Sequence, residues 1–283
     1  MSVRIIVDST ADLLPQIAQR LTIVPLSVRF GDREYVQGVD ITNAQFYEML
    51  VESDTLPTTS QATPYQFENA FREAVEAGDT AVAITLSSKL SGTYQSAVIA
   101  AAEFPGRVFV VDSTSAAIGT GILIEYALQL VDEGLSAEEI AQKLLAQRER
   151  IYVVAMLDTL EYLKKGGRIS KTVAFAGELL SIKPVVSIEG GEVKLLGKAR
   201  GSKQGNNLLV KQIQAAGGVD FSMPLLLGYT GLSDVLLQKY ITDSAMLWEN
   251  YRKALPQTWI GSVIVTHVGP GAVAVAFFSK NET

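Results

Sequence analysis

The chain has 283 residues, a formal net charge of −6, 48% hydrophobic residues and no cysteine. This length allows one large or two ordinary domains with a sizeable core. Without cysteine, disulfides, thiolate zinc sites and cysteine nucleophiles are excluded, which fits a reducing cytoplasm. The single histidine, His267, excludes a multi-histidine metal site, and the acidic charge without a basic tract argues against a nucleic-acid surface. No apolar run approaches the ~20 residues of a membrane span and no signal peptide is present, so we expect a cytoplasmic protein without a transmembrane segment.

The first half of the chain alternates short apolar runs with helical patterns. Buried strands are expected at 4–7, 21–30 (irregular at Pro25), 80–86, 108–111 and 151–155. Helices are expected at 11–21, 43–51 with Thr42 as cap, 64–76 beginning at Pro64, 95–103, 116–132 and 136–148. This alternation predicts a mainly parallel sheet with helices on both faces.

After residue 155 the pattern changes. Strands are expected at 185–188, 193–199, 224–229, 260–266 and 272–278, and the turn Gly190-Gly191 joins the first two as a hairpin. Helices are expected at 160–165, 171–180, 202–215 and 233–254. We therefore expect an α/β domain at residues 1–155, an α+β domain at residues 156–283, and a ligand cleft between them.

Hydroxyl-rich loops follow three of the expected parallel strands. They are Asp8-Ser9-Thr10, the stretch Ser87 to Tyr94, and Asp112-Ser113-Thr114. Because the carboxyl ends of parallel strands meet at one edge of a sheet, we expect these loops to converge there. Free N–H groups at helix starts favour an anion at such an edge, although Ser91 or Thr93 could simply cap a helix. Asp8 and Asp112 could bind a divalent ion, but the favoured interpretation is that they cap or hold nearby hydroxyls.

Three basic side chains are candidates for the same anion site. Arg168 follows Gly166-Gly167, which would let the guanidinium approach a carboxylate or phosphate closely; a helix stop with a solvated arginine is the alternative. His267 is expected at the end of the strand at 260–266, or it is an ordinary buried histidine. Arg200 is a further candidate. Hydroxyls with Arg and His, without a metal cage or an evident nucleophile, suit holding an anionic headgroup.

These motifs resemble those of the DegV family of bacterial fatty-acid-binding proteins. Seven pieces occur in the family's order: Val7 to Leu13, Val24 to Leu26, Thr59 to Gln61, Ser87 to Tyr94, Leu160 to Ser170, Lys183-Pro184 and His267 to Gly271. One departure is Ala62, where the family usually has proline.

The resemblance implies a two-domain α/β protein that holds one long-chain fatty acid, of about 16 to 18 carbons, in a tunnel between the domains. Family hydroxyls matching Thr59 and Ser91 hold the carboxylate, and basic groups matching Arg168, His267 and, in some members, Arg200 lie beside it. We expect the neighbouring Ser60, Gly92 and Thr93 to contribute to the same ligand site.

The resemblance also implies a carrier without catalytic residues, cofactor or metal. Some family members present the bound acid to a separate fatty-acid kinase, which makes the acyl phosphate. Two alternatives remain open: a phosphotransferase-like enzyme that acts on a small anionic metabolite with His267 as relay, and a purely structural interaction module.

Overall fold

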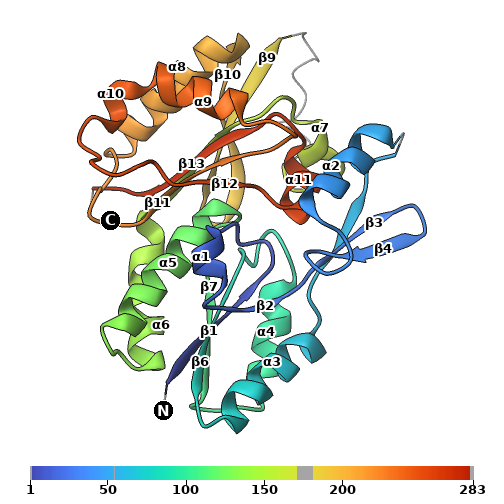
Figure 1. Cartoon of the computed structure of the whole chain (residues 1–283), viewed down its shortest axis with the longest axis vertical. Helices are drawn as coiled ribbons and strands as arrows, with labels where there is room; N and C mark the ends of the chain where they lie inside the picture. Colours follow the sequence, from blue (N-terminus) through green and yellow to red (C-terminus); the bar gives the residue numbers. More distant parts are fainter. Residues whose placement is uncertain (1, 54, 171–180, 281–283) are drawn as a thin grey trace.

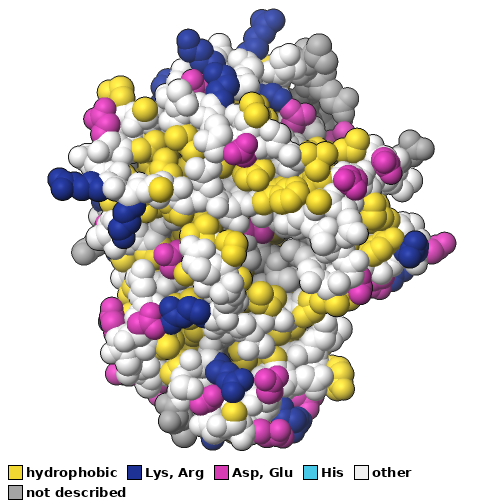
Figure 2. All heavy atoms as spheres, viewed as in Figure 1, with side chains coloured by type: hydrophobic (Ala, Val, Ile, Leu, Met, Phe, Trp, Pro, Cys, Tyr) yellow, Lys and Arg dark blue, Asp and Glu magenta, His cyan; other side chains and the backbone are white. Residues whose placement is uncertain are grey.

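The chain forms two lobes, each built on one large sheet, and a third, small sheet lies beside them (Figure 1). The computed structural model describes residues 2–53, 55–170 and 181–280, so the helix expected at 171–180 lies outside the described residues. Figure 2 shows that basic and acidic side chains are interspersed on the face viewed in Figure 1, and that apolar side chains are exposed across its middle. Within the described residues, no helix combines the length and the apolar character needed to cross a bilayer.

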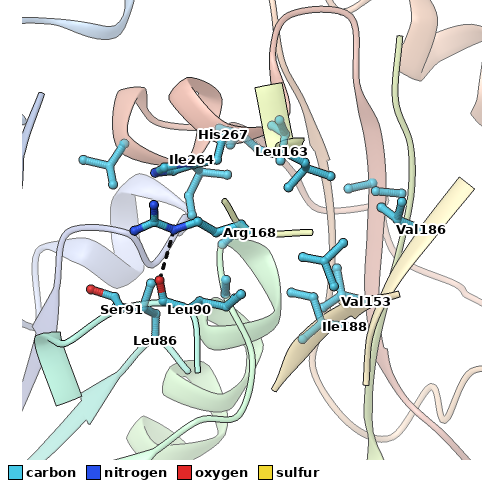
Figure 3. Close-up of a pocket in the computed structure, with 18 of the residues that line it drawn as sticks. Leu86, Leu90, Ser91, Val153, Leu163, Arg168, Val186, Ile188, Ile264 and His267 are labelled. Atoms are coloured by element: carbon cyan, nitrogen blue, oxygen red, sulfur yellow. Dashed lines mark hydrogen bonds between the residues drawn. The ribbon is translucent and has the colours of Figure 1, made fainter. Parts of the chain in front are cut away.

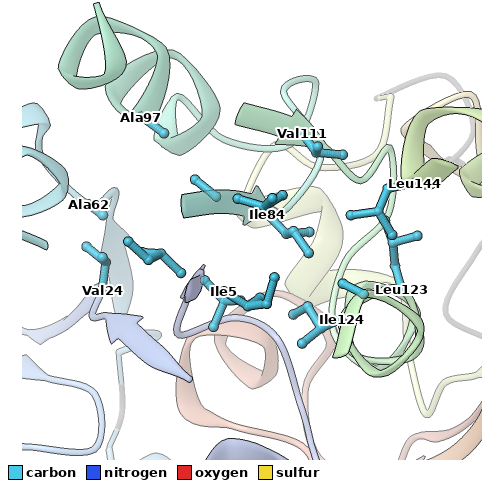
Figure 4. Packing of buried hydrophobic residues seen from close by; sticks show 14 of the residues in the cluster. Ile5, Val24, Ala62, Ile84, Ala97, Val111, Leu123, Ile124 and Leu144 are labelled. Carbon is cyan, nitrogen blue, oxygen red and sulfur yellow. The ribbon is translucent and has the colours of Figure 1, made fainter. Parts of the chain in front are cut away.

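The lower lobe in Figure 1 contains the expected parallel sheet, with strand order β2-β1-β6-β7. Ile6, Val82 and Ile84 are fully buried because helices cover both faces, as the apolar runs predict. One face packs against α5 and α6 and the other against α3 and α4 (Figure 4). The bounds are β1 Val3–Asp8, β2 Thr22–Val24, β6 Thr80–Thr85, β7 Val108–Asp112, α3 Pro64–Glu76, α4 Thr93–Ala101, α5 Ile118–Asp132 and α6 Ala137–Gln147.

Local capping sets several helix starts. Thr42 closes a capping box on α2 (Asn43–Glu52), as the sequence predicts. Thr63 does the same for α3, whose first residue is Pro64. A third capping box, from Ser136, begins α6. These starts depend on side chains within three residues, which is why the sequence reveals them.

A small antiparallel sheet, with order β4-β3-β5, lies beside the parallel sheet. Its strands are β3 Ser27–Phe30, β4 Arg33–Val36 and β5 Thr58–Ser60. Pro25 interrupts the apolar run at 21–30, so that β2 and β3 belong to different sheets. The polar segment before α3 forms β5, which pairs Thr59 with Val28 and thereby fixes the direction of the Thr59 side chain.

The second lobe is built on a six-stranded sheet with order β10-β9-β8-β13-β11-β12, in which only β11 and β12 run parallel. Helices α8 and α9 pack on this sheet, and α5 contacts β8, β11 and β13, so that α5 joins the two lobes. The strands are β8 Ile151–Met156, β9 Ile182–Glu189, β10 Glu192–Arg200, β11 Leu225–Tyr229, β12 Gln257–Trp259 and β13 Val273–Phe278. The helices are α7 Glu161–Lys165, α8 Gly201–Ala215, α9 Val235–Asp243, α10 Ala245–Trp248 and α11 Ser262–Val268, with the short 3₁₀ turn Arg148–Arg150 before β8.

The strand at 151–155 was expected in the parallel sheet, and that prediction is wrong. As β8 it pairs antiparallel with β13 and β9, so the change from one sheet to the other comes before Ile151 rather than at residue 156. An apolar run specifies a buried strand, but long-range pairing decides which sheet receives it.

Three other elements differ from expectation. Of the residues expected as a strand at 260–266, those from Ser262 onward belong to helix α11, in which the Thr266 hydroxyl donates to the Ser262 carbonyl (2.9 Å). Val263 and Val265 are buried there, and tertiary packing overrides their strand propensity. The helix expected at 11–21 is the single turn α1 (Pro15–Ala18). The helix expected at 233–254 divides into α9 and α10 at Ser244, whose hydroxyl donates to the Tyr240 carbonyl (2.7 Å).

Candidate functional site

A cavity of about 210 Å³ lies between the two lobes. Its wall comes from the carboxyl edge of the parallel sheet, the start of α5, the strands of the second sheet, and α11. In Figure 3, Ser91, Arg168 and His267 lie toward one side of the cavity, and Val153, Val186 and Ile188 toward the other. The cavity therefore has a polar end and an apolar remainder.

Small and branched apolar side chains form that remainder. Val153 and Ala155 project from the same side of β8, and Ala274 of β13 pairs with Ala155 across the sheet. The hairpin of β9 and β10 adds Val186, Ile188 and Val193. These apolar side chains offer dispersion contacts to a ligand that runs along them. Ser187 also lines the cavity, and its hydroxyl donates to Glu189 (2.7 Å).

At the polar end, the Thr59 hydroxyl and the His267 ring meet across 208 residues of sequence. The distance between Thr59 Oγ1 and His267 Nε2 is 2.9 Å. Thr59 projects from β5, and His267 stands in the last turn of α11. The strand end expected for His267 is thus a helix end, and the helix carries the ring to the hydroxyl.

The imidazole of His267 is uncharged in this setting. Burial, together with the nearby Arg168 guanidinium, lowers the pKa of His267 to about 4. Because a lowered histidine pKa favours the deprotonated ring, His267 is neutral at neutral pH, and its imidazole has one donor and one acceptor nitrogen, of which Nε2 contacts Thr59.

Ser91 stands before α4 and is held by its neighbour Thr93. Its hydroxyl accepts from the Thr93 backbone N–H (3.2 Å) and lies 2.9 Å from the Thr93 hydroxyl. Gly92 lies between them, and a Cβ at that position would overlap the Gln61 side chain. Gln61 is tied to α4 by donation from its Nε2 to the Ser96 hydroxyl (3.1 Å). The glycine therefore lets β5 and α4 meet closely at the polar end.

Arg168 crosses from the second lobe to the first. Its Nε donates to the Leu90 carbonyl (3.2 Å), as Figure 3 shows, and its Nη1 donates to the Gly166 carbonyl. The side chain is half-buried, and burial lowers the pKa of its guanidinium. Among the described residues, no carboxylate pairs with it. A half-buried cation without an anionic partner is suited to an anionic ligand.

The hydroxyl loops converge at the sheet edge, but their carboxylates serve the fold. Asp8 accepts from the backbone and hydroxyl of Thr10 and from the Leu86 N–H (2.8 Å). Asp112 accepts from the N–H groups of Ser88 (3.3 Å) and Thr114 (2.9 Å). Both carboxylates therefore tie neighbouring loops together, as the favoured interpretation of the sequence states.

The structure brings five of the eight candidate site residues to the cavity wall: Thr59, Ser91, Gly92, Arg168 and His267. Thr93 lies directly behind Ser91. Ser60 and Arg200 are exposed and do not join the wall formed by the described residues. Successive strand residues point to opposite faces, so the exposure of Ser60 follows from the inward direction of Thr59.

Two site residues were missed. Gln61 lines the polar end, and its place directly after Thr59-Ser60 is the signal that could have revealed it, since alternate strand residues share a face. Gly166 lies against the His267 ring, where a Cβ would overlap Nδ1. The local sequence around Gly166 indicates only that it lets Arg168 approach a ligand, because the neighbouring ring comes from the distant α11.

Comparison with known proteins identifies the family. The sequence profile described as "Uncharacterised protein, DegV family" matches residues 2–280. The chain belongs to the DegV family. A DegV domain-containing protein of Caldanaerobacter subterraneus subsp. tengcongensis is 34% identical to this DegV protein over 98% of the chain and 99% of the relative.

Several solved structures share the fold. A fatty-acid-binding DegV family protein from Thermus thermophilus is 33% identical, with a TM-score of 0.88 over 99% of this chain and 100% of that one. A stearic acid-binding protein from Eubacterium ventriosum is 27% identical, with a TM-score of 0.87 over 99% of both chains. The Fatty Acid Kinase (Fak) B3 protein of Streptococcus pneumoniae, loaded with linoleic acid, is 25% identical, with a TM-score of 0.84 over 98% of this chain and 99% of that one.

Proposed function

We propose that this DegV protein binds one long-chain fatty acid, with the carboxylate at the polar end and the hydrocarbon chain along the apolar wall. The observation that carries the proposal is the half-buried Arg168, which has no carboxylate partner among the described residues and lies at the polar end of a cavity whose remaining wall is mainly apolar. Thr59 and Ser91 would donate to the carboxylate. Related proteins crystallised with stearic and linoleic acid support this ligand class.

The apolar part of the cavity would supply most of the binding affinity, and the polar end would orient the ligand. Burying a methylene contributes about 0.8 kcal/mol, so a chain of ~15 methylenes contributes on the order of 12 kcal/mol before ordering costs. The carboxylate adds orientation more than affinity, because it exchanges water for protein hydrogen bonds. Neutral hydroxyl donors keep the head accessible for a later reaction.

The protein would act as a carrier that presents the acid to a separate fatty-acid kinase. The Fak B3 neighbour supports this partner, and the half-buried polar end leaves the carboxylate near the surface. We place this exchange in the cytoplasm, where such a kinase would find ATP. The phosphotransferase alternative is not favoured, because a histidine with a pKa of about 4 is a weak proton relay at neutral pH.

The ligand is tested by native mass spectrometry of freshly purified protein, followed by lipid extraction. We expect one bound acid of about 16 to 18 carbons per chain. The double variant Thr59→Val/Ser91→Ala removes both donors, and its affinity should fall at least tenfold. Ser60→Ala is the matched control, since it removes a hydroxyl from the exposed side of the same strand. Protein that arrives empty and takes up no fatty acid would contradict the proposal.

Arg168→Ala separates presentation from binding. We expect kinase-coupled formation of acyl phosphate to fall by a larger factor than lipid retention, because the hydrocarbon chain dominates affinity. Both quantities are measured on the same preparation, with Arg200→Ala as a control that removes an exposed arginine outside the described wall. An equal loss of retention and phosphorylation would show that Arg168 contributes to binding alone.

A further inference from the structure

The hairpin of β9 and β10 forms part of the cavity wall, and its tip extends beyond the rest of the sheet. β9 pairs with β8 from Val185 to Ser187, so the hairpin tip, residues 189–192, lies past that pairing. β10 is the edge strand and pairs with β9 alone among the described strands. Ile188 and Val193, the cross-strand pair next to the tip, both line the cavity. The position of the tip therefore sets the position of two wall residues.

A buried hydrogen bond joins the hairpin tip to the first lobe. The Ser87 hydroxyl donates to the Gly191 carbonyl (2.7 Å), across 104 residues of sequence. Among the described residues, no other hydrogen bond connects the tip with a residue outside the hairpin. Ser87 follows β6 and is only 1% exposed, so water does not compete for its hydroxyl. This single contact therefore fixes the tip against the first lobe.

The direction of the Ser87 hydroxyl is set by its neighbours. Its oxygen accepts from the Lys89 backbone N–H (3.2 Å), which leaves its one proton for the Gly191 carbonyl. The Ser87 backbone is held in turn, because its N–H donates to the Ser115 carbonyl (2.7 Å). Ser91 of the same hydroxyl-rich loop lines the cavity, whereas Ser87 faces the hairpin tip.

The tip can approach Ser87 because residue 191 is glycine. A Cβ at Gly191 would lie 2.6 Å from Ser87 Oγ, closer than side-chain carbons approach other atoms. Gly190 also has a positive φ (+55°, against +84° for Gly191), but a Cβ there would meet nothing within 4 Å. Both positions thus have a backbone conformation that favours glycine, and only at Gly191 would a side chain break the contact with Ser87.

We infer that Ser87 is a positioning residue for the hydrocarbon chain of the ligand: its hydroxyl holds the hairpin tip against the first lobe and thereby keeps Ile188 and Val193 in contact with the chain. The inference rests on the proposed function and deepens it, because it assigns one hydroxyl of the loop at 87–94 to retention of the hydrocarbon instead of the carboxylate. Ser87 acts through Gly191. Without this bond the tip would move away from the first lobe more often, and the ligand would leave faster although the polar end is intact.

Dissociation kinetics test this role. Ser87→Ala should raise the rate at which bound hexadecanoic acid transfers to excess albumin by about three- to tenfold, because one hydrogen bond that holds the bound state is lost. The association rate should change much less. Ser88→Ala is the matched control, since Ser88 is exposed and its side chain takes no part in the hairpin contact. Equal dissociation rates for the wild type and Ser87→Ala would overturn the inference.

The two glycines of the turn supply a second matched pair. Gly191→Ala should raise the dissociation rate about as much as Ser87→Ala, because the new methyl group displaces the Ser87 hydroxyl. Gly190→Ala introduces a similar backbone strain without that overlap, so its dissociation rate should stay closer to that of the wild type. Equal effects of the two glycine substitutions would show that the contact with Ser87 does not retain the ligand.

A reversible cross-link distinguishes positioning from damage to the fold. The chain has no cysteine, so Ser87→Cys/Gly191→Cys contains only two thiols, and the close approach of the two positions puts these within reach of a disulfide. The oxidised variant should release hexadecanoic acid no faster than the wild type, and reduction with dithiothreitol should raise the rate to that of Ser87→Ala. Both states carry the same substitutions, so a structural defect would not follow the redox state. A folded variant that forms no disulfide, or releases ligand equally fast in both states, would overturn the inference.

Hydrogen exchange of the ligand-free protein separates this inference from the proposed function. Ser87→Ala should raise amide exchange severalfold in the peptide covering 186–195 and leave β1 and β6 unchanged. If this change appears but the wild type binds no fatty acid, the proposed function is overturned, and with it the action of Ser87 on a ligand. If fatty acid binds while exchange at the tip and dissociation are the same in both proteins, the carrier function stands and the role of Ser87 is overturned.

Discussion

Replacing Ala155 with phenylalanine is expected to abolish retention of a long-chain fatty acid while the protein stays folded. Ala155 projects from β8 into the apolar part of the cavity, opposite the start of α5 and beside Ala274. A phenyl ring there would occupy the path of roughly four or five methylenes of the ligand. The binding free energy should weaken by about 3–4 kcal/mol, which is a loss of some hundredfold to thousandfold in affinity. The polar end is untouched, so the loss isolates the contribution of the hydrocarbon chain.

Lipid extraction and thermal unfolding measure this effect. Added fatty acid should raise the melting temperature of the wild type, since a ligand that binds only the folded state stabilises it, and should leave Ala155→Phe unchanged. Ala155→Val is the graded control, because its smaller side chain blocks less of the cavity and should give an intermediate loss. If Ala155→Phe retained one acid per chain, the hydrocarbon would have to lie elsewhere.

Asp12→Asn is expected to remove a pH dependence from the stability of the fold. Asp12 is only 6% exposed, accepts from the Gly261 N–H (2.8 Å) at the start of α11, and leaves Oδ2 without a partner among the described residues. Burial raises the pKa of Asp12 to about 8, with a further contribution from Asp8. At pH 7 the native state therefore holds a proton that the unfolded chain has released.

Linkage between proton binding and folding sets the direction in which stability changes with pH. A carboxyl with a raised native pKa stabilises the fold fully at low pH, and that stability is lost as the pH rises from about 4 to about 8. Urea unfolding at several pH values should show the wild type losing up to about 1.4 kcal/mol per pH unit from this group. Asp12→Asn keeps an oxygen that accepts from the Gly261 N–H. Because the amide does not titrate, the contribution of Asp12 to the pH dependence of the unfolding free energy should disappear.

Two comparisons isolate the effect of Asp12. The pKa of the buried Asp8 is also raised and its carboxyl remains in the variant, so the difference between the two slopes reports Asp12 together with its interaction with Asp8. Asp132→Asn is the surface control; its partner Arg20 holds the pKa of Asp132 below its usual range, so this carboxyl is already ionised from pH 5 to 8. Equal slopes for wild type and Asp12→Asn would show that Asp12 is ionised in the native state.

The features that the sequence predicted well depend on neighbours in the chain. Thr42 and Pro64 mark helix starts because a cap acts within one turn. The apolar run of β6 marks a buried central strand, since burial on both faces requires unbroken hydrophobicity. Motifs in a fixed order identified the family, and the profile match to residues 2–280 confirms it.

By itself, then, the sequence determined the parallel sheet, the hairpin at Gly190-Gly191 and the residue types at the polar end, because these follow from local pattern and composition. Only the tertiary structure decided that α11 is a helix, that β8 joins the second sheet, and that Thr59 meets His267 while Ser60 faces away. Those outcomes arise from packing and pairing between segments far apart in the chain, whose energies exceed the local propensities that a sequence displays.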